Sequence, residues 1–315
     1  MIMTKTLRNL HLAALCSAAL IPTTQAETIW ADGVSLEEGG WVDINKSVNG
    51  NAWANKTEGS MCYAIAAANL ITWWQSKYEI PEGTPNTAED IWATYLSYAS
   101  EGGGNSHYAL QWWFSGKYFA PAFTSEYGEK LLNDRENLYF NEAAVSSTLN
   151  QLICFSGGTS LVAAATSEGG LQATIINALR NGVGLAIGLS GKFSHTVTLW
   201  GVEVDDQTQQ ITKLWLTDSD DARQDLGNYQ NPSIFSVDVQ KVTKNINNQE
   251  IETLLLVGND GDRGYNNVYI SALYGIDSSV SNSEIWGLTP AIPEPATATL
   301  SLMALAALAA RRRRH

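Results

Sequence analysis

The sequence predicts an α+β domain with two lobes, one helical and one built from antiparallel strands. An alanine-rich segment over residues 60–74 has its larger apolar residues spaced at three and four positions, which predicts a buried helix. A second predicted helix at 171–182 is followed by β-branched and apolar segments typical of strands, at 183–190, 195–204 and 211–217. Similar segments at 234–239, 253–258 and 267–276 extend the strand-rich lobe. We therefore expect a site in the cleft between a helical and a β lobe.

The first residues of the chain predict export. Lys5 and Arg8 form a basic start, residues 10–21 are mostly apolar, and Ala26 ends a small-residue cleavage site before Glu27. The apolar stretch is shorter than a membrane span. We expect residues 1–26 to be a signal peptide, and its removal also removes Cys16.

The last residues of the chain predict a second targeting signal. Pro293-Glu294-Pro295 is followed by an apolar run at 296–310 and by Arg311 to Arg314. This order resembles the PEP-CTERM sorting signal of Gram-negative-type bacteria; the alternative is a plain tail anchor with cytoplasmic arginines. We expect residues 289–315 to be a sorting tail whose apolar run is a transmembrane helix and the only membrane contact. The protein would be exported, to the cell surface or outer envelope or into the medium.

Charge limits the partners of the remaining domain, residues 27–288. The whole chain has 19 basic and 32 acidic residues; without its two ends it keeps 13 and 31, a formal net charge of −18. Nucleic acids and anionic lipids require basic patches, so neither is an expected partner.

Few residues of this domain can carry chemistry. It contains two cysteines, Cys62 and Cys154, and two histidines, His107 and His195. Without CxxC or HxxxH spacing there is little material for zinc, and the acidic segments at 218–221 and 259–262 do not match a calcium loop. We expect no metal and no cofactor. Two cysteines in an exported protein can also form a disulfide, which is the alternative to a reactive thiol.

Cys62 lies where a thiol is easily activated. Ser60 is a suitable N-cap for the helix at 60–74, which puts Cys62 in the first helical turn. Free N–H groups and the helix dipole favour an anion there and lower a thiol pKa. The apolar stretch 149–155 is expected to be a buried helix, in which Cys154 is a small hydrophobe.

A base and an orienting acid follow on neighbouring strands. His195 begins the predicted strand 195–204, and Asp218 ends the strand 211–217, with Asp220 just beyond. An antiparallel pair can bring His195 beside Asp218, which would fix the imidazole tautomer. Each residue could instead be structural: His195 a buried sheet histidine, and the two carboxylates solvated turn residues. His107 follows three glycines and is expected in a mobile loop, and the aromatic residues of 109–119 are expected in the core.

At four places the chain resembles the IdeS/Mac group of secreted bacterial cysteine endopeptidases. The matching segments are residues 40–50, the helix with Cys62, Ala66, Asn69 and Trp73-Trp74, the strand 195–204 and the acidic motif 216–221. The resemblance implies a papain-like two-lobed fold and cleavage of a protein substrate, immunoglobulin G near its hinge in that group. It also implies that Cys62 is the nucleophile, His195 the base and Asp218 its orienting acid. Asp220 would support the site, and Lys46 would stabilise the oxyanion.

The expected reaction is therefore peptide-bond hydrolysis through a thioester, on a protein substrate that is an immunoglobulin or another glycoprotein. Two alternatives remain open. The chain could be a non-enzymatic surface binding protein on the same scaffold, or it could transfer acyl groups to amines, as a transglutaminase or an amidase does.

Overall fold

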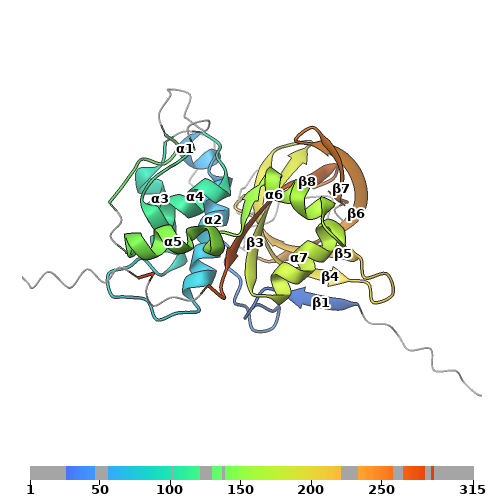
Figure 1. Ribbon diagram of the computed structural model, residues 1–315, viewed down its shortest axis with the longest axis horizontal. Helices are drawn as coiled ribbons and strands as arrows, with labels where there is room; N and C mark the ends of the chain where they lie inside the picture. Colours follow the sequence, from blue (N-terminus) through green and yellow to red (C-terminus); the bar gives the residue numbers. More distant parts are fainter. Residues whose placement is uncertain are drawn as a thin grey trace, which may run out of the picture.

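The computed structural model describes residues 26–46, 56–100, 102–120, 130–136, 139–220, 233–257, 265–280 and 285–286. Its helices are α1 (Lys56–Gly59), α2 (Cys62–Gln75), α3 (Ala88–Tyr98), α4 (Ser106–Ser115), α5 (Glu142–Leu152), α6 (Gly158–Thr166) and α7 (Gly170–Arg180). Its strands are β1 (Glu27–Trp30), β2 (Phe155–Gly157), β3 (Val183–Gly191), β4 (His195–Val204), β5 (Ile211–Thr217), β6 (Phe235–Ile246), β7 (Gln249–Leu256) and β8 (Val268–Asp277). Helices α1 to α5 lie together beside the strands, and α6 and α7 pack against the strands themselves (Figure 1).

Six strands close into an antiparallel barrel. Each strand from β3 to β8 pairs with the next along the chain, and β8 pairs back with β3. Strand β1 adds to β4 and strand β2 to β8. Closure satisfies the backbone hydrogen bonds on both sides of each barrel strand, which an open sheet cannot do at its edges.

This closed barrel shows that the predicted papain-like two-lobed fold was wrong. The individual strands β3, β4 and β5 begin and end within one residue of the predicted segments. The antiparallel pairing of β4 with β5 was also predicted. The pairing of β8 back to β3 was not, because closure depends on where the register shifts. The ladder shifts between Gly188 and Leu189 in the β3–β8 pair, and twice in the β4–β5 pair. Such irregularities bend and twist a strand, which allows a sheet to curl back on itself.

Helix α2 is buried on nearly all sides, as its alanine-rich sequence requires. Of its residues after Cys62, only Thr72 is more than slightly exposed. Its small alanines allow α3, α4 and the strands β3 and β4 to approach it closely. The predicted Ser60 cap was wrong: Met61 occupies the N-cap position, and no side chain caps the helix.

Two other local predictions need correction. His107 lies in the first turn of α4, where the Asn105 side chain caps the helix by accepting from the His107 amide at 2.8 Å, and it is not in a loop. Cys154 lies two residues past the end of α5, outside any helix. The prediction that the aromatic stretch belongs to the core was confirmed for Trp112, Trp113, Phe114 and Tyr118, which are buried, whereas Phe119 is 55% exposed.

No helix among the described residues is long and apolar enough to cross a membrane. Residues 1–25 of the predicted signal peptide, the apolar run 296–310 and the acidic segment 259–262 lie outside the described residues.

Candidate active site

Three segments that are distant in the sequence meet at one end of the barrel. Strands β4 and β5 are antiparallel neighbours with Thr198 opposite Thr217, so the start of β4 and the end of β5 lie at the same end. His195 and Asp218 are therefore adjacent. Helix α2 packs across β4 with Cys62 at its first position.

A buried amide fixes α2 relative to β4. The Asn69 side chain accepts from the Ile44 amide at 3.0 Å and donates to the Thr198 hydroxyl at 3.0 Å. Asn69 is fully buried, so these bonds have no competition from water. One side chain thus joins the helix of Cys62, the strand of His195 and the segment that leads to Lys46.

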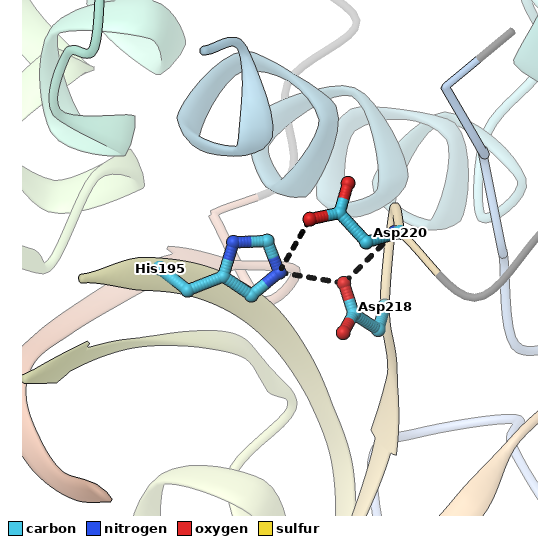
Figure 2. A group of neighbouring side chains, drawn as sticks. All are labelled: His195, Asp218 and Asp220. Carbon is cyan, nitrogen blue, oxygen red and sulfur yellow. Dashed lines mark hydrogen bonds and ion pairs between the residues drawn. The ribbon is translucent and has the colours of Figure 1, made fainter. Parts of the chain in front are cut away.

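Two carboxylates face the same nitrogen of the His195 imidazole. Its Nε2 lies 2.6 Å from Asp218 Oδ1 and 4.0 Å from Asp220 Oδ2 (Figure 2). The Asp220 amide donates to the same Asp218 oxygen at 3.0 Å. Because Asp218 occupies Nε2, the second ring nitrogen, Nδ1, is left to serve a different partner.

The thiol of Cys62 lies close to this imidazole. The two groups are near enough for charge and hydrogen-bonding interactions between them to shift the pKa of each. Cys62 and Cys154 are both free, so the alternative of a disulfide between them does not hold. The candidate site thus brings together a free thiol, an imidazole and a carboxylate, and the imidazole is hydrogen-bonded to the carboxylate.

The charges around Cys62 and His195 favour an ion pair between these two side chains. Burial by itself raises the pKa of the Cys62 thiol, but the charge and hydrogen bond of His195, helped by Lys46 and the Thr196 backbone, bring it below the usual value. Burial alone would lower the pKa of His195, but the charges of Asp218 and Cys62 hold it well above its usual range. The geometry therefore favours a thiolate and an imidazolium.

Cys154 and His107 provide a contrast. Burial, with the nearby Asp277 charge, raises the pKa of the Cys154 thiol to about 12, so this thiol stays protonated and unreactive at neutral pH. Burial lowers the pKa of His107, which keeps that imidazole neutral. Neither residue is part of the group around Cys62.

Lys46 belongs to the group. Its side chain is 5% exposed, and its Nζ lies 2.6 Å from Asp220 Oδ1 and donates to the Gly59 carbonyl at 2.9 Å. Its backbone amide donates to the Ser219 carbonyl at 2.9 Å. Residue 46 therefore connects the end of β5 to the loop that leads into Cys62. All five residues expected at the site are brought together: Cys62, His195, Asp218, Asp220 and Lys46.

Sequence reasoning missed Tyr265. Its hydroxyl donates to Asp218 Oδ2, the carboxylate oxygen that does not face His195. Tyr265 is 2% exposed and precedes β8, 47 residues after Asp218. No motif surrounds it, and only the packing of the barrel brings it to Asp218.

Ligand atoms of His195, Asp218 and Asp220 lie within 4.8 Å of one another, close enough for one metal ion. Two cationic partners already compensate these carboxylates, because Lys46 pairs with Asp220 and the imidazolium pairs with Asp218. A divalent ion would have to displace at least one of them. The arrangement therefore fits acid–base chemistry better than metal binding.

Comparison with known proteins adds two findings. Residues 291–314 match the PEP-CTERM protein-sorting motif, which confirms the predicted sorting signal. This motif directs C-terminal sorting of exported proteins, and the chain is accordingly an exported protein of the cell surface or extracellular space.

The second finding is a distant relative. The chain is 24% identical over 220 residues to the IgM protease of Streptococcus suis (strain P1/7), and the match covers 60% of this chain and 18% of that protein. The chain thus spans less than a fifth of the length of the relative it matches. At this level the similarity indicates a relationship to a peptidase and does not single out the IdeS/Mac group.

Proposed function

We propose that this protein is an exported cysteine endopeptidase that hydrolyses peptide bonds of a protein substrate. The observation that carries the proposal is the convergence of Cys62, His195 and Asp218: the imidazole is hydrogen-bonded to Asp218 and lies close enough to the free thiol to lower its pKa. A structural cysteine needs no imidazole partner, whereas a nucleophilic one does. The distant similarity to a peptidase supports the same reaction class.

The proposed reaction begins from the thiolate and imidazolium. The Cys62 sulfur bonds to the scissile carbonyl carbon, His195 gives its proton to the leaving amine, and the carbon–nitrogen bond breaks to form a thioester. His195 then takes a proton from water, and the resulting hydroxide attacks the thioester. The carbon–sulfur bond breaks, which releases the acid and restores both the thiolate and the imidazolium. Asp218 keeps the imidazole in the tautomer and orientation that both steps require.

Two donors are available for the oxyanion. The first amides of a helix have no partner within it, and Cys62 is the first residue of α2. Lys46 has three N–H donors, two of which are engaged by Asp220 and Gly59. We assign the third, with the Cys62 amide, to the developing negative charge.

The proposed substrate is an immunoglobulin or another glycoprotein. The name of the relative from Streptococcus suis supports an immunoglobulin as the first substrate to test. Because that relative is several times longer, contacts outside the matched part could select its substrate. The sorting motif favours action at the cell surface, on proteins that reach it.

The test is cleavage by residues 27–288 of a panel of IgM, IgG and unrelated glycoproteins, with sequencing of new N-termini. Wild-type protein and the Cys154→Ser variant should cleave the same bond, because Cys154 is outside the site. Cys62→Ala should lose cleavage by at least about 1,000-fold with unchanged thermal unfolding, because no other group supplies the nucleophile.

An active Cys62→Ala variant would overturn the proposal. Products joined to an added amine, in place of free carboxylates, would instead identify the chain as an acyl transferase on the same residues.

A further inference from the structure

We propose that Tyr265 is a positioning residue of the site, which holds the Asp218 carboxylate so that one oxygen always faces His195. The inference rests on the proposed function and deepens it. It assigns a role to a residue outside the four segments through which the sequence predicted the site.

The two oxygens of Asp218 have separate partners. Oδ1 accepts from the Asp220 amide and faces His195 Nε2, and Oδ2 accepts from the Tyr265 hydroxyl. Asp218 is 8% exposed, so water cannot readily replace a lost donor. With Tyr265 in place, rotation of the carboxylate would break a bond on each of its oxygens. Tyr265 therefore removes the orientations in which Oδ1 points away from the imidazole.

The tyrosine ring is itself held by aromatic neighbours. Its centroid lies 5.7 Å from that of Phe235 on β6 and 6.0 Å from that of Phe193 in the turn before β4. Phe193 in turn packs edge-on against His195 at 6.2 Å. These ring contacts hold the tyrosine ring in place and so keep its hydroxyl directed at Asp218.

The consequence is a measurable effect on Cys62. In Tyr265→Phe the buried Oδ2 of Asp218 lacks a donor. The Asp218 carboxylate then either rotates away from His195 or takes up a proton. Both responses weaken the imidazolium that stabilises the thiolate. The fraction of Cys62 present as thiolate should then fall about tenfold at mildly acidic pH, as for a rise of about one unit in the thiol pKa.

The experiment follows alkylation of Cys62 by iodoacetamide as a function of pH, by mass spectrometry of the Cys62 peptide, with rates normalised to the folded fraction from circular dichroism. The control is Tyr95→Phe, which removes an equally buried hydroxyl that donates to the Ala109 carbonyl at 2.8 Å within the helices. We expect Tyr265→Phe to move the onset of alkylation to higher pH and Tyr95→Phe to leave it unchanged.

The outcomes separate this inference from the proposed function. An onset in Tyr265→Phe equal to that of wild type, or at lower pH, would overturn the positioning role while wild-type Cys62 remained activated. Slow alkylation of wild-type Cys62, with the pH dependence of an ordinary thiol, would overturn the proposed function itself. This readout needs no substrate, so it does not depend on which protein is cleaved.

Discussion

At the scale of single residues, the charge balance of the site explains why five ionisable groups can be buried together. Cys62, Asp218 and Asp220 are negative when ionised, and His195 and Lys46 are positive. Each anion has a cationic neighbour, and Asp218 has additional donors in Tyr265 and the Asp220 amide. Removal of His195, Lys46 or either carboxylate leaves a buried charge without compensation, which is costly in a poorly hydrated interior. Removal of the Cys62 sulfur does not, because the imidazolium still pairs with Asp218.

This balance predicts the pH dependence of activity. The thiolate–imidazolium pair exists between the pKa of Cys62, which is lowered, and the pKa of His195, which is raised above its usual value of about 6.5. Activity should rise with pH through the first and fall through the second. In Asp218→Asn the largest influence that raises the His195 pKa is lost, so the alkaline limb should move to lower pH.

We expect kcat/KM of Asp218→Asn to fall by about 100-fold or more, because the amide also favours the wrong imidazole tautomer. The control is Asp206→Asn, the same change on an exposed turn between β4 and β5. The measurement is the pH profile of kcat/KM for wild type and for both variants. An unchanged alkaline limb in Asp218→Asn would contradict the assigned role.

At the scale of elements, the seam between β4 and β5 sets the distance between base and acid. Thr217, the last residue of β5, accepts from the Trp200 indole of β4 at 2.8 Å and donates to the Val42 carbonyl at 2.9 Å. Trp200 and Thr217 are at most 1% exposed. The Thr217 hydroxyl therefore joins β5 to β4 directly before Asp218. It also holds the segment that carries Lys46 against these strands.

Thr217→Val tests this seam. Valine has the same shape but leaves the indole N–H and the Val42 carbonyl unpaired, so the free energy of unfolding should fall by about 2 kcal/mol in urea titrations. Thr212→Val on the same strand is the control, because its hydroxyl is only half-buried, and water can replace its 3.2 Å bond to the Glu203 carbonyl. Equal losses in the two variants would show that burial of the Thr217 hydroxyl has no special importance.

At the scale of the whole molecule, the site depends on how the helices pack against the barrel. The barrel orients His195 and Asp218 through strand pairing, but Cys62 enters from a helix outside it. Asn69 connects the two parts through Thr198 of β4 and the Ile44 amide. The position of the sulfur relative to the imidazole therefore depends on tertiary contacts.

Asn69→Leu tests whether this amide supports the site as well as the fold. The leucine leaves Ile44 N–H and the Thr198 hydroxyl without partners, which predicts a loss of about 3 kcal/mol in the free energy of unfolding. The activity of the remaining folded protein should also fall, because α2 is less firmly held on β4. Asn177→Leu, on the exposed face of α7, is the control and should change neither quantity much. Full activity per folded molecule in Asn69→Leu would mean that the amide supports only the fold.

Short stretches of the sequence were enough to predict the local features of this protein. Periodicity identified helix α2 and most strands, and the targeting residues at the C-terminus identified the sorting motif. Cys62 and His195 stood out because the domain has two cysteines and two histidines, and Asp218 because it ends the strand that follows the strand of His195. Roles for Asp220 and Lys46 followed from a resemblance. Each of these signals is carried by residues close together in the chain or by composition.

The way in which these parts combine depends on tertiary packing. Closure of the barrel depends on register shifts such as that at Gly188 and Leu189, which leave no distinct pattern in the sequence. Tyr265 lies just before β8, and the pairing of β8 with β3 brings its hydroxyl to Asp218. Asn69 reaches Thr198 because helix α2 packs across strand β4. Contacts of this kind form between segments that are distant along the chain, so their geometry is set by packing and not by any local run of residues.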